Sequence, residues 1–485
     1  MNTPQSAVRS SQSTDVLIIG AGPGGYVCAI RAAQLGRRVI VAEKARAGGI
    51  CLNWGCIPTK ALLHGVHSLH LAQEGAQFGL TCGTPVMDIA RLAAWRNRVV
   101  ERTVRGVEYL IGQNRVELVT GIAEFVSPRE VKVTAPDGTA TRTLADHVVI
   151  ATGSEPAALP GLEPDGERII TSNEAVMLRS VPARLLIVGA GAIGLEFASI
   201  YAGLGSEVTV VEIMEQVLPG TDREIAGQLE RALRKRRINV LLKTRVASVE
   251  KAESLTVNLT AADSSSSSLD PSIPALVVDQ VLVAVGRRPL TKGLAIENSG
   301  VRLNPKGFIS VDDQLQTSQA GVFAIGDVAR APLLAHKASR EGIVVAEQIA
   351  GLASSINLKA VPNCVFTDPE LATVGLTEAE AIAAGHEVAI GRFPVSALGR
   401  AATINRLEGM CKIVADRKTD RILGVHILAP EASSLISEGA LVVQHGITAR
   451  ELAAAIHPHP TLGELLMEAA ESVHGQAIHI PPPKS

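Results

Sequence analysis

The strongest constraint on the fold is a unit that occurs twice. Each copy has a short apolar run, a glycine-rich turn, a helical stretch, a second apolar run and an acidic residue. The first copy contains Gly20, Gly22, Gly25 and Glu43, and the second contains Gly189, Gly191, Gly194 and Glu212. Glycines at this spacing allow a tight turn and a close approach to a phosphate, and the acid suits a ribose hydroxyl. The sequence therefore predicts two dinucleotide-binding folds, and the intact glycines and acids disfavour one inactive copy.

Two cysteines, Cys51 and Cys56, lie five residues apart just beyond the first unit. Pro58 is typical of the first turn of a helix, which places Cys56 near a helix N-terminus, where the dipole favours the thiolate. A structural zinc pair would need further ligands, and the other cysteines occur singly (Cys28, Cys82, Cys364 and Cys411). Two unrelated core cysteines are the other alternative. A redox-active pair is the favoured interpretation.

Length and composition exclude several classes of protein. A chain of 485 residues exceeds one hydrophobic core and suggests about three domains. A net charge of −2 with 2% aromatic residues gives no case for binding nucleic acid. Six cysteines do not make a secreted disulfide scaffold, which favours a reducing compartment such as the cytoplasm. The apolar run 185–204 contains Glu196 and splits into strand, turn and helix, so no membrane span is expected.

Residues 48–60, Gly-Gly-Ile-Cys-Leu-Asn-Trp-Gly-Cys-Ile-Pro-Thr-Lys, resemble the redox-active disulfide of the pyridine nucleotide–disulfide oxidoreductases. The resemblance continues through the chain except for about the first dozen residues. Family members commonly have Thr, a small apolar residue and Ser in place of Ile50, Trp54 and Thr59. The resemblance implies FAD and NAD as cofactors, a Cys51–Cys56 disulfide, and oxidation of a dihydrolipoyl dithiol with reduction of NAD⁺.

The resemblance also implies a domain order. The predicted fold class is α/β, with two Rossmann-like dinucleotide-binding domains and a C-terminal α+β dimerisation domain. A disordered tail is expected at 1–14, the FAD domain at 15–153 and 286–356, an inserted NAD domain at 154–285, and the dimerisation domain at 357–485. The low-complexity stretch 262–274 is expected to be a flexible hairpin loop without chemistry. The implied partners are a second copy of the chain, forming a homodimer, and the lipoyl domain of a 2-oxo acid dehydrogenase or glycine cleavage complex.

The stretch 457–464 matches the family motif H-x-H-P-T-x-x-E. By resemblance, His459 is the catalytic base, supplied by the other subunit of the dimer, and Glu464 is its acidic partner; His457 is expected to be structural. An imidazole titrates in the range needed to deprotonate a thiol, and a carboxylate can fix its tautomer. Two alternatives come from the residues alone: Thr461 and Glu464 also form a helix capping box, and two histidines could bind a metal. No metal site is expected.

The remaining site residues are assigned to cofactor binding. By resemblance, Lys60 forms an ion pair with Glu196 beside the flavin, Asp327 holds the ribityl chain, and Ala335 contacts the flavin through its main chain. The full predicted set comprises Gly20, Gly22, Gly25, Glu43, Lys60, Gly121, Thr152, Gly153, Gly189, Gly191, Gly194, Glu196, Glu212, Val246, Gly286, Asp327 and Ala335. Alternatives within and outside the enzymes are a glutathione-reductase-like disulfide reductase, a mercuric reductase and a non-catalytic flavoprotein scaffold. A mercuric reductase would carry a C-terminal cysteine pair, which 478–485 lacks.

Overall fold

The computed structural model describes residues 8–81, 83–263 and 274–481. The chain forms two compact units, each assembled from separate stretches of sequence. The first unit comprises Met1–Leu62, Asp88–Ala157 and Gly286–Ile356, and the second comprises Leu63–Met87, Ala158–Val285 and Asn357–Ser485. Helix α3 (Cys56–Glu74) begins in the first unit and ends in the second. The expected loop at 262–274 lies largely outside the described residues.

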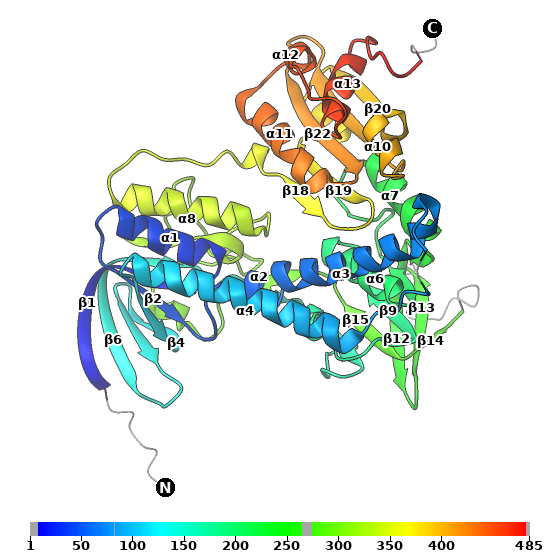
Figure 1. Cartoon of the computed structure of the whole chain (residues 1–485). Helices are drawn as coiled ribbons and strands as arrows, with labels where there is room; N and C mark the ends of the chain where they lie inside the picture. Colours follow the sequence, from blue (N-terminus) through cyan, green and yellow to red (C-terminus); the bar gives the residue numbers. More distant parts are fainter. Residues whose placement is uncertain (1–7, 82, 264–273, 482–485) are drawn as a thin grey trace. The chain divides into compact units, whose positions relative to one another are not determined.

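The first unit is built on a seven-stranded sheet in the order β3-β2-β1-β6-β5-β4, with β17 paired to β6. Strands β3, β2, β1, β6 and β17 are parallel, and β4 and β5 are antiparallel. Helices α1 and α8 lie side by side (Figure 1). The elements are β1 (Val8–Ile19), α1 (Pro23–Gln34), β2 (Val39–Glu43), α2 (Gly49–Asn53), α4 (Ile89–Gln113), β3 (Glu117–Thr120), β4 (Ile122–Ser127), β5 (Glu130–Thr134), β6 (Ala140–Ile150), β7 (Ser154–Pro156), β16 (Arg287–Pro289), β17 (Val322–Ala324) and α8 (Ala335–Ile349).

The expectation of a disordered tail at 1–14 is wrong for residues 8–14. Strand β1 begins at Val8 and pairs in parallel with β6 from Ala140 onward. Here Gln12 Nε2 donates to Thr143 Oγ1 at 3.2 Å, and the Thr14 hydroxyl donates to the Arg38 carbonyl at 2.8 Å. Polar residues without an apolar pattern form a strand in this case because the long strand β6 offers them a free edge.

The second unit contains a five-stranded parallel sheet in the order β11-β10-β9-β15-β8 and a three-stranded antiparallel sheet, β12-β13-β14. The strands are β8 (Ile169–Ile170), β9 (Arg184–Val188), β10 (Glu207–Val211), β11 (Ile238–Leu241), β12 (Thr244–Lys251), β13 (Leu255–Ala261), β14 (Leu276–Val278) and β15 (Gln280–Val283). The helices are α5 (Ser172–Ala175), α6 (Ala192–Gly203) and α7 (Arg223–Lys235). The apolar run 185–204 thus divides into β9, a turn and α6, as expected.

The C-terminal part of the second unit is a five-stranded antiparallel sheet, β18-β19-β22-β21-β20. Helices α11 and α13 pack against this sheet. The elements are β18 (Asn363–Val365), β19 (Glu370–Gly375), α9 (Glu378–Ala383), β20 (Val388–Pro394), α10 (Gly399–Thr403), β21 (Met410–Asp416), β22 (Ile422–Ala429), α11 (Ala432–His445), α12 (Ala449–Ala454) and α13 (Glu464–Ser472).

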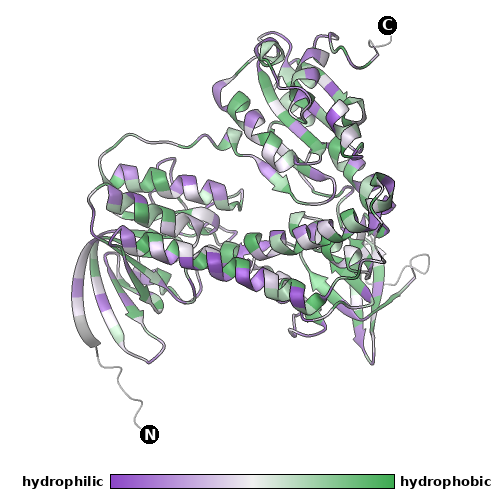
Figure 2. Cartoon of the chain, viewed as in Figure 1, coloured by the Kyte–Doolittle hydropathy of each residue, from purple (hydrophilic) through white to green (hydrophobic). Residues whose placement is uncertain are grey.

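The cores follow the strand pattern expected for parallel sheets covered on both faces. Val16, Leu17 and Ile18 of β1 are completely buried, and so are Leu186 and Ile187 of β9. Helix α4 alternates between hydrophobic residues, green in Figure 2, and hydrophilic residues, purple. The predicted α/β class, with two doubly wound parts and a C-terminal α+β part, is confirmed; the domain boundaries at 153/154, 285/286 and 356/357 stay predictions.

Candidate active site

The first glycine loop joins β1 to α1. Gly20 has φ +103°, a conformation that favours glycine, and Gly22 is the N-cap of α1. A Cβ on Gly25 would overlap the Gly20 carbonyl oxygen, so the turn can close this tightly only with glycine. Glu43, at the end of β2, accepts hydrogen bonds from Ala21 N at 2.7 Å and from Ala45 N at 2.8 Å. The carboxylate is therefore fixed at the mouth of the loop.

The second glycine loop, between β9 and α6, repeats this geometry. Gly189 has φ +107°, and a Cβ on Gly194 would overlap the Gly189 carbonyl oxygen. Glu212 follows β10 and accepts from Ala190 N and Met214 N at 2.8 and 2.9 Å. Each loop thus presents glycine backbone, a helix N-terminus and an oriented carboxylate. These features fit the pyrophosphate and ribose of a dinucleotide.

The two cysteines lie on consecutive helices of the first unit. Cys51 lies in the short helix α2, and Cys56 is the first residue of α3. Their side chains share a hydrogen bond. That hydrogen bond raises the pKa of the Cys51 thiol strongly, burial raises it further, and the charge of Lys60 opposes both. Cys56 lies at the N-terminus of α3, where the helix dipole favours a thiolate.

Asp327 belongs to a network that the sequence did not reveal. Ser154 Oγ donates to Asp327 Oδ2 at 2.6 Å and accepts from Arg287 Nε at 2.8 Å. Burial lowers the pKa of Arg287, whereas the charges of Asp327 and Cys56 raise it. Arg287 and Ser154 therefore orient Asp327 within the first unit. A possible signal was the charged pair 287–288 directly after the apolar run of β15.

A second overlooked cluster holds the turn that carries Asp327, the short 3₁₀ helix Gly326–Val328. The buried carboxylate of Glu341 accepts from Gly326 N at 2.7 Å and from Arg330 Nε at 2.9 Å, and Lys337 Nζ lies 3.3 Å from it. Lys337 Nζ also donates to the Arg330 carbonyl at 2.6 Å. These paired charges fix the backbone on both sides of Asp327.

His459 and Glu464 form a hydrogen-bonded pair in the second unit. His459 Nδ1 lies 2.8 Å from Glu464 Oε1, and 75% of the histidine side chain is exposed. Glu464 Oε2 accepts from Thr461 N at 2.9 Å, so the carboxylate holds the backbone just before helix α13 with one oxygen and binds the imidazole with the other. Burial opposes ionisation of Glu464, but the hydrogen bonds from His459 and Thr461 outweigh it and lower its pKa. The capping box expected as an alternative is not formed: α13 begins after Gly463 without a side-chain cap, and the Thr461 hydroxyl donates to the Pro458 carbonyl at 2.8 Å.

His457, expected to be structural, has both ring nitrogens engaged. Nδ1 lies 2.9 Å from the Ala455 carbonyl and Nε2 lies 2.9 Å from Glu438 Oε1. Its side chain is only 7% exposed. Within the ranges that the structure describes, no group of three or more His, Cys, Asp or Glu side chains could hold a metal ion. Likewise, no described helix is long and apolar enough to cross a membrane.

The remaining predicted residues are divided between the units. In the first unit, Gly121 N donates to the Glu43 carbonyl at 2.9 Å, Thr152 Oγ1 donates to the Leu290 carbonyl at 2.7 Å, and Gly153 and Gly286 have positive φ. Ala335 begins α8. In the second unit, Val246 lies in β12, and the buried Glu196 accepts from Phe366 N at 3.0 Å. Lys60 and Glu196 belong to different units, so their ion pair stays a prediction.

Comparison with known proteins gives the family. Residues 14–342 match the family described as pyridine nucleotide-disulphide oxidoreductase, and residues 361–470 match its dimerisation domain. The chain belongs to this family. It is 48% identical over 468 residues to dihydrolipoyl dehydrogenase of Thermus scotoductus, covering 96% of this chain and 98% of that protein.

Two further matches cover nearly the whole chain. The mitochondrial dihydrolipoyl dehydrogenase 1 of Arabidopsis thaliana is 42% identical over 477 residues, covering 98% of this chain and 93% of that protein. Among solved structures, LpdA of Mycobacterium tuberculosis superposes with a TM-score of 0.87 at 29% identity, covering 94% and 99% of the two chains. The family membership and the fold expected from the sequence are therefore confirmed.

Proposed function

We propose that this chain is a dihydrolipoyl dehydrogenase, which oxidises protein-bound dihydrolipoamide to lipoamide and reduces NAD⁺ to NADH. The proposal is carried by one observation: a chain that is similar over nearly its full length to proteins of that name also has the two pairs that the reaction needs. Cys51 is hydrogen-bonded to Cys56, and His459 is hydrogen-bonded to Glu464. A scaffold protein would have no use for a dithiol and an oriented base.

The chemistry of the chain's own residues begins from the oxidised Cys51–Cys56 pair. His459 Nε2 takes a proton from one substrate thiol, while Glu464 holds Nδ1–H and stabilises the imidazolium. The resulting thiolate attacks Cys51 Sγ, the Cys51–Cys56 bond breaks, and Cys56 leaves as the thiolate. The second substrate thiol displaces Cys51, which closes the cyclic disulfide and leaves the cysteines reduced by two electrons.

The cofactors of the proposed enzyme are FAD and NAD. Bound FAD would take the electron pair from the dithiol and deliver it to NAD⁺ as hydride. For FAD, the proposed ligands are the first glycine loop, Glu43, the Asp327 network and the backbone at Ala335. The second loop with Glu212 is the proposed NAD site. A carboxylate there favours a ribose 2′-hydroxyl over a 2′-phosphate, and no Arg lies in 213–219.

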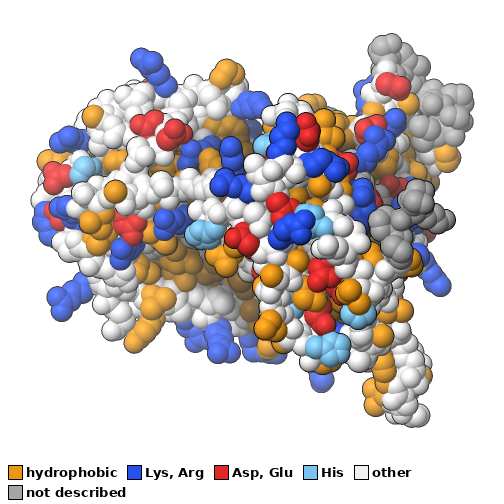
Figure 3. Space-filling model, turned by 90° about the horizontal axis from the view of Figure 1, so that it is seen from above, with side chains coloured by type: hydrophobic (Ala, Val, Ile, Leu, Met, Phe, Trp, Pro, Cys, Tyr) orange, Lys and Arg blue, Asp and Glu red, His pale blue; other side chains and the backbone are white. Residues whose placement is uncertain are grey.

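The proposed assembly is a homodimer that receives the lipoyl arm of a 2-oxo acid dehydrogenase or glycine cleavage complex. The dimerisation domain at 361–470 supports the homodimer. Charges of both signs are interspersed over the face seen in Figure 3, so recognition of the lipoyl domain would depend on local contacts. The proposed compartment is the cytoplasm, with an organelle matrix as the alternative, since a dithiol cycle needs reducing surroundings.

The test is steady-state turnover of the purified holoprotein with dihydrolipoamide and NAD⁺, followed at the NADH absorbance band. We expect NADH to form, kcat/KM for NADP⁺ to be lower by about tenfold or more, and no reduction of glutathione disulfide by NADPH. H459Q should be almost inactive and serves as the control for non-enzymatic reduction. Turnover of glutathione disulfide in place of dihydrolipoamide would replace this proposal with a glutathione-reductase-like one.

A further inference from the structure

Helix α13 carries a row of three acids on one face. Glu464, Glu468 and Glu471 are spaced by four and three residues, so they follow one another along the helix surface. Glu468 is nearly completely buried, and the Oε2 atom of Glu471 is buried with no hydrogen-bond partner among the described residues. Like charges at this spacing repel one another. The acid that orients His459 is therefore the first of a row that needs a compensating positive charge.

The C-terminal segment 475–481 supplies that charge. His479 Nδ1 makes a short contact with Glu468 Oε1, and Ile478 N donates to Glu468 Oε2 at 3.1 Å. The hydrogen bond with Glu468 and its charge raise the pKa of His479, and the charges of Glu464 and Glu471 add to this effect. These contacts favour the protonated form of His479 beside the row, although two-thirds of its side chain is exposed.

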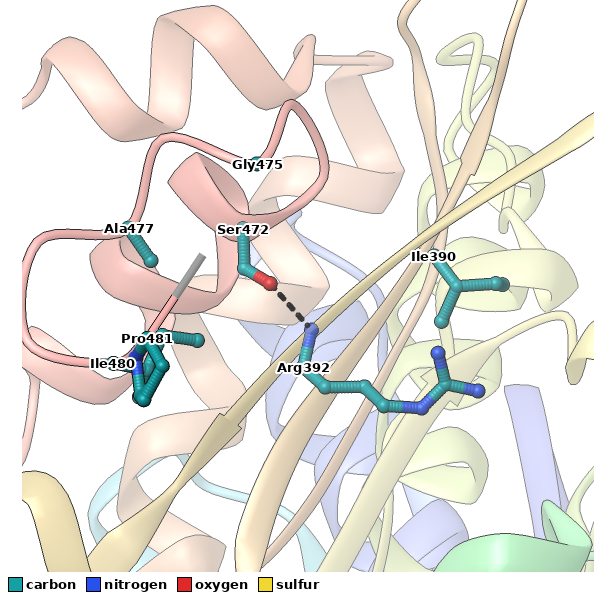
Figure 4. A pocket seen from close by; sticks show the side chains of 7 residues that line it. All are labelled: Ile390, Arg392, Ser472, Gly475, Ala477, Ile480 and Pro481. Atoms are coloured by element: carbon teal, nitrogen blue, oxygen red, sulfur yellow. Dashed lines mark hydrogen bonds between the residues drawn. The ribbon is translucent and has the colours of Figure 1, made fainter. Parts of the chain in front are cut away.

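On its apolar side the segment packs Ala477 and Ile480 against the hydrophobic core of the C-terminal sheet. Figure 4 shows residues Gly475, Ala477, Ile480 and Pro481 of the segment across a gap from Ile390 and Arg392 of strand β20. The cavity they line measures about 250 Å³. The dashed contact in the figure joins Arg392 N to Ser472 Oγ of α13 at 3.1 Å and does not involve the segment. Two backbone hydrogen bonds join the start of the segment to α13, from Gly475 N to the Ser472 carbonyl and from Gln476 N to the Glu471 carbonyl, both at 3.0 Å. Farther along the segment, its described polar contacts with α13 are those with the Glu468 carboxylate.

We propose that His479 is a positioning residue for the reaction: by pairing with Glu468 it fastens the C-terminal segment to α13 and keeps Glu464 oriented toward His459. The inference rests on the proposed function, since it concerns the base of that reaction. Glu464 lies one helical turn before Glu468, so loosening of this turn, or an unbalanced charge on it, acts directly on the His459–Glu464 hydrogen bond.

The experiment compares H479Q with wild type and with H386Q as holoproteins. His386 forms an equivalent pair with Asp416, at 2.7 Å in the same unit, but neither residue belongs to the row on α13. Dihydrolipoamide oxidation is measured against pH, and amide hydrogen exchange is measured on the peptide 464–472. The variants H479K and H479Q/E468Q separate the effect of the His479 charge from the effect of the His479–Glu468 hydrogen bond, which attaches the C-terminal segment to α13.

We expect H479Q to lower kcat roughly tenfold with little change in KM, well short of the ~10²–10⁴-fold that loss of a general base costs. The acid limb of kcat/KM should move to higher pH by about 0.4 unit, because an unpaired Glu468 charge one helical turn from Glu464 stabilises the protonated form of His459. Exchange of 464–472 should be faster. H479K and H479Q/E468Q should restore the acid limb but not the slow exchange, and H386Q should behave as wild type.

The outcomes separate the two proposals. If wild type does not oxidise dihydrolipoamide, the proposed function fails, and the exchange measurement still tests the attachment of the segment. If wild type is active and H479Q matches H386Q in kcat, acid limb and exchange, the role of His479 is refuted. Should H479Q not fold, faster exchange in H479K with an unmoved acid limb supports the inference, and slow exchange overturns it.

Discussion

At the scale of single residues, the site depends on carboxylates whose two oxygens hold two different partners. Glu43 and Glu212 each accept from two backbone amides beside a glycine loop. Glu464 accepts from Thr461 N and pairs with His459. Such a carboxylate cannot turn without losing a hydrogen bond, so it arrives at the reaction already oriented.

E464Q tests whether Glu464 acts on His459 in the reaction or only holds the backbone at Thr461. The amide keeps an acceptor oxygen but loses the charge that stabilises the imidazolium, so we expect kcat to fall by roughly 10²–10³-fold. The matched control is E451Q, because Glu451 closes a capping box with Thr448 on α12 and has no histidine partner. That variant should lose little stability and keep its activity. Equal activities of the two variants would show that Glu464 has only a structural role, through its hydrogen bond with Thr461 N.

The cysteines are expected to differ in the reduced holoprotein. C51S should retain the long-wavelength absorbance of a thiolate beside the flavin, because Cys56 at the start of α3 remains. C56S should lose this absorbance, and both variants should be inactive with dihydrolipoamide. The measurement is a titration with dithionite followed by absorbance spectroscopy. Identical spectra would show that the two sulfurs do not have separate roles.

At the scale of helices and strands, the apolar runs and the glycine spacing predicted two strand–turn–helix–strand units, which the structure forms as β1-α1-β2 and β9-α6-β10. Contacts between distant segments were not predictable. Ser154, Arg287 and Asp327 come together only because β7 pairs with β16 and β17 pairs with β6. The polar strand at 8–14 had no apolar alternation to indicate it, since its stabilising partner is β6.

A buried charge cluster joins α7 to the C-terminal sheet. Lys412 of β21 lies 2.9 Å from Asp222, the N-cap of α7, and 2.8 Å from Glu378 of α9, and both Lys412 and Asp222 are almost fully buried. Burial opposes both charges, but their hydrogen bonds and attraction prevail. The pKa of Asp222 is lowered and that of Lys412 is raised.

K412M should therefore destabilise the protein by about 3–5 kcal/mol, because it leaves buried carboxylates without a partner. Asp222 contributes to the free energy of unfolding at pH values above its pKa in the unfolded chain, about 3.9. This contribution is lost as the pH falls through the lowered pKa of Asp222 in the folded protein. Lys412 contributes to the free energy of unfolding at pH values below its pKa in the unfolded chain, about 10.4. This contribution is lost as the pH rises through the raised pKa of Lys412 in the folded protein. The destabilisation caused by K412M should thus be largest between about pH 5 and 10.

The measurement is the midpoint of denaturant unfolding across this pH range. K235M is the control, because Lys235 on the same helix pairs with Glu408 at 3.0 Å while 69% of its side chain is exposed. Exposed pairs contribute about 0–1 kcal/mol. A K412M midpoint no lower than that of K235M would show that the cluster does not stabilise the unit.

At the scale of the whole molecule, the dithiol and the base belong to different units of the chain. The first unit holds Cys51 and Cys56, and the second holds His459 and Glu464 in the part that matches a dimerisation domain. A two-fold interface repeats the same surface on both subunits, so a base supplied across it creates two equivalent sites. A cleft between subunits would also admit a long lipoyl arm while excluding bulk water.

Complementation between inactive variants tests whether the base comes from the other subunit. H459Q and C51S are mixed, dissociated and reassociated, and heterodimers are verified with two different tags. If the base acts across the interface, each heterodimer has one intact site and one site with both defects, so it should regain about half of the wild-type activity. If the base acts within one subunit, both sites of the heterodimer keep a defect and no activity returns. H459Q mixed with E464Q is the control: both changes lie in the same pair, so every site keeps a defect under either arrangement. Activity in the first mixture and not in the second assigns His459 to the neighbouring subunit's cysteines, whereas verified heterodimers that stay inactive place the base beside its own.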